Sequence, residues 1–391
     1  MAVKTISILG STGSVGTQTL DILAADPARF RVRALVGGRN AALLAAQALA
    51  FRPDIVVIDD EAAYPALREA LQGTGIESAA GRRAVIDAAS IAVDWTMAAI
   101  TGTAGLEPTL AAIRQGRAVA LANKEALVSA GDLMLDAVAR AGATLLPVDS
   151  EHNAIFQALA DGNRARVEKI ILTASGGPFR LASLDEMRAA TPEIALKHPV
   201  WSMGAKISID SATMFNKGLE VIEAARLFGL RSAEIEVLIH PQSIIHGMVC
   251  YSDGSVIAQL GSPDMRIPIA HTLAWPERIE TGAKRLDLAA AARLEFAPPD
   301  DARFPALPLA RAALEAGAGA PAILNAANEV AVAAFLERRI GFLDIAGIVA
   351  ATLDRLGAPP VDDLPAVFEL DRQARQEAGQ KVQAISTSRA A

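Results

Sequence analysis

Hydroxyl, amide and ammonium groups gather in one short stretch of the chain, and an acidic side chain follows them closely. Ser211, Asn216 and Lys217 offer the donors that a phosphate group needs. Glu220 follows Asn216 and Lys217 at roughly one helical turn, so it can share their face. A carboxylate beside a phosphate repels it unless a cation lies between them. This stretch therefore predicts a divalent metal ion.

Two further acidic residues, Asp149 and Glu151, follow a predicted strand over residues 144–148. If the chain stays extended to residue 151, both side chains point the same way, because side chains alternate along a strand. Together with Glu220 they would form a hard-oxygen site for Mg²⁺ or Mn²⁺, with Co²⁺ as a further option. The alternative interpretation is a solvated acidic turn that caps a helix beginning at Asn153.

A loop precedes the phosphate donors. Pro199 disfavours helix at the residue before it, and Gly204 offers a hinge. Trp201 and Met203 on such a loop predict a lid that covers a ligand and excludes water.

The first 148 residues alternate β-branched runs with Ala- and Leu-rich runs, which predicts a doubly wound parallel sheet of the Rossmann type. The predicted strands cover residues 5–9, 32–36, 55–58, 93–96, 118–121 and 144–148. Glycines at 10, 13 and 16 end the first strand and open the first helix, so this turn is expected to bind a dinucleotide pyrophosphate. The alternative is an ordinary glycine-rich turn.

The end of the second strand bears on the choice of dinucleotide. It carries no acidic residue for a ribose hydroxyl, and Arg39 can pair with a 2′-phosphate instead, which favours NADPH. A solvent-exposed arginine is the alternative. The expected cofactor contacts in these two turns are Thr12, Gly13, Ser14, Val15, Gly38, Arg39 and Asn40.

Composition limits the partners and the compartment. The formal charge of −7 and pI of about 5.4 argue against nucleic-acid binding. No apolar run reaches the ~20 residues of a membrane span, so no membrane partner is expected. Cys250 is the only cysteine and reads as a core residue in a strand, which fits a reducing cytoplasm.

Beyond residue 148 the pattern predicts a central α/β domain and then a helical domain. Strands are expected at 167–173, 235–239, 243–251 and 256–260, and the last three are expected to form an antiparallel sheet with an edge that must be covered. Helices are expected at 308–316, 322–337, 342–356 and 364–384, with a disordered tail at 386–391. The predicted domains are 1–148, 149–275 and 301–391, with 276–300 as a linker. His152, His240 and His246 are interpreted as packing or hydrogen-bonded structural residues.

An ordered series of motifs resembles the 1-deoxy-D-xylulose 5-phosphate reductoisomerase family. It comprises G-S-T-G-S-V-G at 10–16, A-N-K-E at 122–125, V-D-S-E-H at 148–152, A-S-G-G-P-F at 174–179, the stretch 197–220, I-H-P-Q-S-I-I-H at 239–246 and N-A-A-N-E-V-A-V at 325–332. The resemblance implies an NADPH- and metal-dependent oxidoreductase that converts 1-deoxy-D-xylulose 5-phosphate to 2-C-methyl-D-erythritol 4-phosphate in non-mevalonate isoprenoid biosynthesis. It also implies a homodimer that uses the open sheet.

The same resemblance implies individual roles. Lys124, Glu151 and His198 are expected to be catalytic, and Asn123, Glu125 and Gly204 to contact the nucleotide. Substrate contacts are expected from Lys124, Ser150, Glu151, Ser175, His198, Trp201, Met203, Ser211, Asn216, Lys217 and Glu220, and metal contacts from Asp149, Glu151 and Glu220.

Three rival interpretations remain at this point. An aspartate-semialdehyde dehydrogenase also begins with a glycine-rich turn but needs a nucleophilic cysteine. A metal-free NADP dehydrogenase for another sugar phosphate would not need the three carboxylates. A non-enzymatic nucleotide sensor would leave the phosphate donors and the lid unexplained.

Overall fold

The computed structural model describes residues 3–159, 163–201 and 203–390. The chain divides into two compact units. The first unit comprises Met1–Ala126, Met134–Asn153 and Asp264–Lys284, and the second comprises Leu127–Leu133, Ala154–Pro263 and Arg285–Ala391. None of the described helices is long and apolar enough to cross a membrane.

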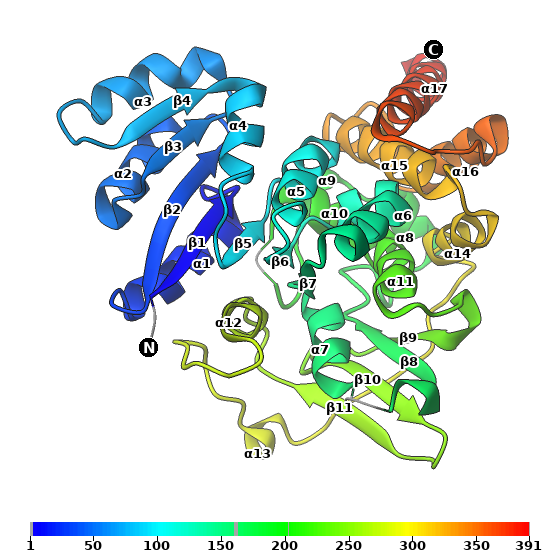
Figure 1. Cartoon of the computed structure of the whole chain (residues 1–391). Helices are drawn as coiled ribbons and strands as arrows, with labels where there is room; N and C mark the ends of the chain where they lie inside the picture. Colours follow the sequence, from blue (N-terminus) through cyan, green and yellow to red (C-terminus); the bar gives the residue numbers. More distant parts are fainter. Residues whose placement is uncertain (1–2, 160–162, 202, 391) are drawn as a thin grey trace. The chain divides into compact units, whose positions relative to one another are not determined.

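The first unit is built on a parallel sheet of seven strands in the order β4-β3-β2-β1-β5-β6-β7 (Figure 1). The strands are β1 (Lys4–Leu9), β2 (Phe30–Gly37), β3 (Ile55–Ile58), β4 (Glu77–Ala80), β5 (Trp95–Ala98), β6 (Ala118–Leu121) and β7 (Thr144–Pro147). The connecting helices are α1 (Ser14–Ala25), α2 (Ala41–Phe51), α3 (Tyr64–Ala70), α4 (Gly81–Ala89), α5 (Leu106–Ile113) and α6 (Lys124–Ala141), of which Leu127–Leu133 belongs to the second unit. The chain winds from β1 first to one edge and then to the other, which confirms the predicted doubly wound fold.

Helix α12 (Arg266–Ala274) also belongs to the first unit, although the sequence assigns it to the central domain. It packs on α1, β6 and β7. Lys4 at the start of β1 donates from Nζ to the carbonyl oxygen of Leu273 at 2.6 Å. These contacts, made to residues distant in sequence, explain why the boundary could not be placed from composition.

We expect His271 on α12 to make the stability of the protein depend on pH. Burial, with a smaller contribution from Arg278, lowers the pKa of its imidazole from 6.5 to about 4. The unfolded chain therefore takes up this proton near pH 6.5, and the folded chain only near pH 4. The stability that the neutral ring contributes is present above pH 6.5 and is lost as the pH falls toward 4.

We expect this loss to be about 1–2 kcal/mol, after discounting for the solvent that still reaches the ring. Urea unfolding followed by circular dichroism between pH 7.5 and 4.5 would measure it. The free energy of unfolding of His271→Gln should fall less steeply with pH than that of the wild type. Parallel pH profiles for the two proteins would contradict the assignment to His271.

The second unit contains a four-stranded sheet in the order β11-β10-β8-β9. Its strands are β8 (Val167–Ala174), β9 (Ile235–Ile239), β10 (Ile245–Tyr251) and β11 (Val256–Leu260). The expected antiparallel pairing of β10 with β11 is present, but the expected place of β9 in an antiparallel sheet is wrong, because β9 pairs in parallel with β8 and not with β10. The described residues between β8 and β9 are largely helical, and such a crossover is what parallel pairing requires.

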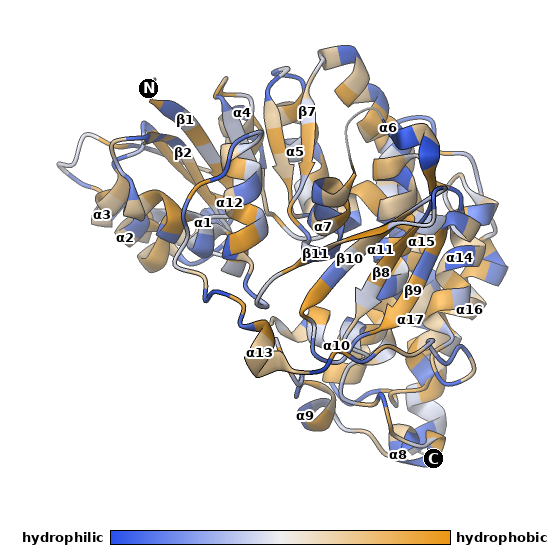
Figure 2. Cartoon of the chain, turned by 90° about the horizontal axis from the view of Figure 1, so that it is seen from below, coloured by the Kyte–Doolittle hydropathy of each residue, from blue (hydrophilic) through white to orange (hydrophobic). Residues whose placement is uncertain are grey.

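The two edges of this sheet differ. At the β9 edge, Ile239 forms a bridge with Ala297. At the β11 edge, Val256 and Ile257 are exposed at 53% and 44%. Between these edges the strands are mostly hydrophobic (Figure 2), and Ile170, Leu172 and Val249 are fully buried.

Helices make up most of the remaining second unit. They are α7 (Ser150–Ala158), whose first turn belongs to the first unit, α8 (Leu184–Arg188), α9 (Pro192–Ala195), α10 (Ala205–Thr213), α11 (Phe215–Phe228), α13 (Leu288–Ala291), α14 (Ala306–Ala316), α15 (Ala320–Leu336), α16 (Asp344–Leu356) and α17 (Leu364–Ala390). The prediction of a disordered tail from residue 386 is wrong for the residues up to Ala390, because α17 extends to Ala390. Arg389 in this last turn pairs with Asp344 at 3.2 Å. Residue 391 lies outside the described residues.

Candidate active site

Lys124 and Asp149 meet at the carboxyl ends of two neighbouring strands. Lys124 begins α6 shortly after β6, and Asp149 follows β7. Because β6 and β7 pair in parallel, their ends lie at the same edge of the sheet. The Lys124 ammonium is 2.5 Å from a carboxylate oxygen of Asp149, and the lysine is buried. The structure thus joins the A-N-K-E and V-D-S-E-H motifs.

Asp149, Glu151 and Glu220 form a group of carboxylates. One oxygen from each lies within 4.8 Å of the others. The predicted extended backbone at 149–151 is wrong, since α7 begins at Ser150 and places Glu151 in its first turn. The start of a helix favours negative charge there. Ser150 donates from Oγ to Glu151 Oε2 at 2.5 Å. Carboxylate oxygens at this spacing suit Mg²⁺ or Mn²⁺.

Glu220 also joins this group to the phosphate donors on α11. Its carboxylate accepts a hydrogen bond from Asn216 Nδ2 at 2.5 Å and another from Lys217 Nζ. Glu220 and Lys217 are both buried, so the opposite charges compensate each other away from water. The expected shared face of α11 is therefore present.

The end of α10 brings Ser211 toward the loop that carries Ser175. Gly177 in this loop has a φ of +63°, and a Cβ there would lie 2.8 Å from the Ser211 carbonyl oxygen. Only glycine allows both this left-handed backbone and this approach. The two predicted phosphate hydroxyls are thus carried by segments in direct contact. Met214, with a φ of +67°, then joins α10 directly to α11 and its Asn216.

His198 is held in one neutral form by its neighbours. Its Nδ1 accepts from the backbone N–H groups of Val200 and Trp201, at 3.2 and 2.8 Å. The proton must therefore lie on Nε2, which donates to Ser175 Oγ at 2.8 Å. Burial lowers the pKa of His198, in agreement with a neutral ring. Because Ser175 Oγ accepts this hydrogen bond from His198, the serine O–H can donate to a different acceptor.

The predicted lid follows His198 and is a loop up to Gly204, where α10 begins. The centre of the Trp201 ring lies 6.2 Å from that of His246 on β10. Met203 is half-buried, and residue 202 lies outside the described residues. Closure of this loop over a ligand stays a prediction.

The glycine turn after β1 is closely packed. Gly10 has a φ of +94°, and a Cβ there would lie 2.6 Å from the Ala99 carbonyl oxygen just beyond β5. A Cβ on Gly16 would lie 2.3 Å from the Gly10 carbonyl oxygen. Gly13 and Ser14 are exposed where α1 begins, with Thr12 and Val15 half-buried beside them. The backbone N–H groups at this helix start can therefore face a pyrophosphate.

The other expected cofactor residues differ in whether their side chains are exposed or already hydrogen-bonded within the protein. Arg39 and Gly38 are exposed after β2. Asn40 caps α2 by accepting from the Leu43 N–H at 3.1 Å. Asn123 caps α6 in the same way and donates to the Gly102 carbonyl oxygen at 3.0 Å. Its amide is thus used inside the protein, and we expect any nucleotide contact to come from its backbone. Glu125 lies in the first turn of α6.

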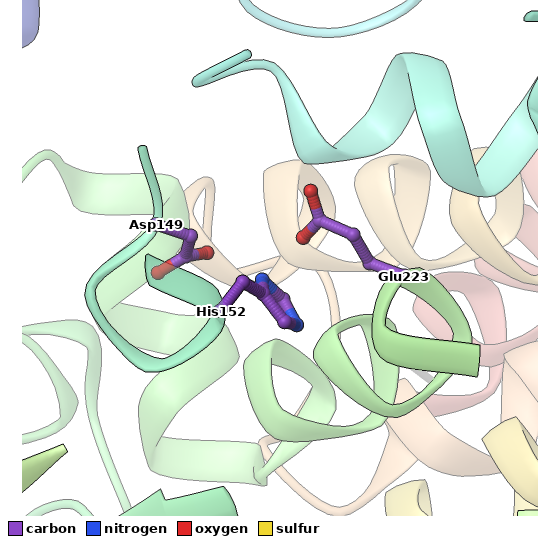
Figure 3. Close-up of side chains that lie close together, drawn as sticks. All are labelled: Asp149, His152 and Glu223. Atoms are coloured by element: carbon purple, nitrogen blue, oxygen red, sulfur yellow. The ribbon is translucent and has the colours of Figure 1, made fainter. Parts of the chain in front are cut away.

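Sequence reasoning missed one acidic residue near the carboxylates. Asp149, His152 and Glu223 each offer one ligand atom within 4.8 Å of the others. Asp149 and His152 come from the start of α7, and Glu223 comes from α11 (Figure 3). Glu223 follows Glu220 by three residues on one helix, and this spacing is the signal that could have identified it. His152, interpreted from the sequence as a packing residue, is fully buried within this group.

His240 serves the local fold. Its Nε2 accepts from the N–H groups of Ile244 and Ile245, and its Nδ1 contacts the carbonyl oxygen of Glu295 at 2.9 Å. The ring also stacks on Phe296. The predicted structural role of His240 is confirmed.

Sequence models of one family match three parts of the chain. "1-deoxy-D-xylulose 5-phosphate reductoisomerase" matches residues 6–131, its "C-terminal domain" matches 145–228, and "DXP reductoisomerase C-terminal domain" matches 260–377. The 1-deoxy-D-xylulose 5-phosphate reductoisomerase of Gluconobacter oxydans (strain 621H) is 63% identical over 95% of this chain and 91% of its own. That of Rhodospirillum centenum is 58% identical over 99% and 96%.

Solved structures agree with these sequence matches. The Zymomonas mobilis enzyme, solved in complex with NADPH, has a TM-score of 0.93 and 54% identity over 97% of this chain and 99% of that one. A DOX-P reductoisomerase in complex with NADPH, fosmidomycin and magnesium has a TM-score of 0.92 and 44% identity over 97% and 98%. The chain therefore belongs to the 1-deoxy-D-xylulose 5-phosphate reductoisomerase family.

Proposed function

We propose that this protein is an NADPH- and divalent-metal-dependent reductoisomerase that converts 1-deoxy-D-xylulose 5-phosphate to 2-C-methyl-D-erythritol 4-phosphate. The observation that carries the proposal is the group of three carboxylates in a chain of this family. Relatives solved with NADPH, fosmidomycin and magnesium support both cofactors.

In this proposal Asp149, Glu151 and Glu220 hold Mg²⁺ or Mn²⁺. A cation bound there polarises the ketone of the substrate and stabilises developing oxyanion charge. Lys124, whose ammonium lies against Asp149, adds a donor for a substrate oxygen at the same place. Ser150 orients Glu151 through its hydrogen bond and contacts the substrate.

The substrate phosphate is bound by Ser175, Ser211, Asn216 and Lys217 in this proposal. His198 orients the Ser175 hydroxyl as a donor to the phosphate, because the His198 Nε2–H donates a hydrogen bond to Ser175 Oγ. These contacts lie away from the bond that breaks, so their binding energy is used for orientation. Trp201 and Met203 would exclude water above the site.

NADPH would supply the hydride. The residues proposed to bind it are Thr12, Gly13, Ser14, Val15, Gly38, Arg39, Asn40, Asn123, Glu125 and Gly204. The small exposed residues where α1 begins allow the backbone N–H groups to approach the pyrophosphate.

One rival reading conflicts with the structure. An aspartate-semialdehyde dehydrogenase needs a reactive thiolate. Cys250 lies buried in β10, and burial raises the pKa of its thiol, so the thiolate is disfavoured.

NADPH oxidation in the presence of 1-deoxy-D-xylulose 5-phosphate, with and without Mn²⁺, tests the proposal. Turnover should require both the sugar phosphate and the cation. Oxidation that persists after chelation, or the absence of turnover with this substrate, would refute it.

Arg39→Ala tests the choice of dinucleotide. Since the exposed guanidinium of Arg39 is proposed to pair with the 2′-phosphate, its loss should raise the KM for NADPH about tenfold. The KM for NADH, which has no 2′-phosphate, should change little. Arg52→Ala, just beyond the other end of α2, provides a matched control. An equal effect on both dinucleotides would contradict the pairing.

We further propose that the protein is a cytoplasmic homodimer. Val256 and Ile257 expose apolar surface on edge strand β11, and a second copy would cover it. The lone cysteine of the sequence fits a reducing compartment.

A further inference from the structure

Asn153 holds the short connection that carries Asp149. It lies in the first turn of α7 and is 1% exposed. Its backbone N–H donates to the Asp149 carbonyl oxygen at 2.8 Å. Its side-chain Nδ2 donates to the carbonyl oxygen of Pro147, the last residue of β7, at 2.9 Å. Asn153 therefore holds the backbone of this connection at two points, Asp149 and Pro147.

The same amide nitrogen contacts His271 on α12. The distance from Asn153 Nδ2 to His271 Nδ1 is 3.1 Å. An amide nitrogen carries two hydrogens, so it can donate to Pro147 and to His271 together. Turning the amide over would place its oxygen against the Pro147 carbonyl oxygen, so its orientation is set. His271 Nδ1 must then be an acceptor, and the ring carries its proton on Nε2.

His271 in turn sits on a firmly held helix. Helix α12 packs on β6 and β7, the strands that end next to Lys124 and Asp149. Asp264 accepts from the Arg266 N–H at 2.9 Å where the helix begins, and Lys4 bonds to Leu273 near its end. Asn153 therefore connects the start of α7 to α12, a helix of the same unit that is itself held by contacts with the sheet.

We propose that Asn153 and His271 are a positioning pair for the cation site. The pair holds the backbone that carries Asp149 and Glu151, so that their carboxylates meet the cation with little rearrangement. Neither residue of the pair ligates the cation. Residues that orient ligands in this way typically contribute 10- to 100-fold to metal affinity. The inference rests on the proposed function, because it requires that these carboxylates bind a cation.

Mn²⁺ binding to the full chain, measured by electron paramagnetic resonance of free Mn²⁺, tests the pair without relying on turnover. Asn153→Ala should weaken binding about 10- to 100-fold. His271→Leu, which removes the acceptor, should weaken it about tenfold. His271→Gln supplies a side-chain oxygen as acceptor and should restore binding to within about threefold of the wild type. NADPH affinity, measured by fluorescence, should stay unchanged in all three variants.

Thr272→Val is the matched control, because it removes a buried hydrogen bond to Ile269 from the same helix without touching Asn153. Its Mn²⁺ affinity should equal that of the wild type. Wild-type affinity in Asn153→Ala, or equal losses in His271→Leu, His271→Gln and Thr272→Val, would overturn the proposal. If Asn153→Ala does not fold, the two His271 variants decide alone. Failure of the wild type to bind Mn²⁺ would overturn the cation site itself, and the role of the pair with it.

Discussion

Replacing Glu151 with glutamine should lower kcat about a thousandfold, the size of effect expected when one main electrostatic contact to developing charge is lost. Glutamine keeps the shape of the side chain and can still accept from Ser150 Oγ, which lies 2.5 Å from Glu151 Oε2. It loses the negative charge that the proposed cation requires. The start of α7 should therefore stay folded while the carboxylate group loses one member.

Steady-state kinetics at saturating Mn²⁺, together with NADPH binding by fluorescence, measures this effect. NADPH affinity should be unchanged, which separates loss of the cation site from general damage. Glu236→Gln removes a carboxylate that pairs with Lys169 in the partly exposed sheet, and it should retain wild-type kcat. A kcat for Glu151→Gln within tenfold of the wild type would show that Glu151 is not a metal ligand in the reaction.

Gly16→Ala should weaken NADPH binding about 10- to 100-fold, as expected from an overpacking cost of 1–3 kcal/mol. The added methyl group would lie 2.3 Å from the Gly10 carbonyl oxygen and 2.5 Å from Ser11 Cα. Both are backbone atoms, so no side chain can turn away to make room. The turn itself must shift, and with it the N–H groups proposed to face the pyrophosphate.

Gly347→Ala is the matched control for this substitution. Gly347 also lies within a helix, α16, and a Cβ there would meet nothing within 4 Å. Alanine at this position should leave NADPH binding unchanged and stabilise the fold by about 0.5–1 kcal/mol, because glycine is a poor helix former. Fluorescence titration and thermal unfolding of both variants would measure these effects. Equal NADPH affinity in Gly16→Ala and the wild type would contradict the proposed turn.

Most of the fold could be predicted because its strands have strong local signals. The runs Ile55–Ile58 and Ala118–Leu121 are strands as expected. The sequence gives no local signal for strand β4, Glu77–Ala80, since E-S-A-A contains no β-branched or aromatic residue, and this strand pairs only at the edge of the sheet. Its conformation is imposed by pairing with β3.

For the candidate site, the sequence indicates the residue types that gather there, but not the backbone conformation that brings them together. The strand pattern predicts that Asp149 and Glu151 converge through an extended backbone, whereas a helix begins at Ser150. A polar residue followed by an acid is also a typical helix start, and that signal competes with the strand pattern. The contact between Asn153 and His271 joins residues 118 apart in the chain, so no local pattern could reveal it.

The carboxylate of Glu220 should couple the binding of phosphate to the binding of the cation. It accepts from Asn216 and Lys217, the proposed phosphate donors, and it also belongs to the proposed cation group. Two ligands that share one side chain cannot bind as independent events. By thermodynamic reciprocity, the factor by which Mn²⁺ changes the affinity for inorganic phosphate equals the factor by which phosphate changes the affinity for Mn²⁺. The saturation curve of either ligand therefore shifts with the concentration of the other.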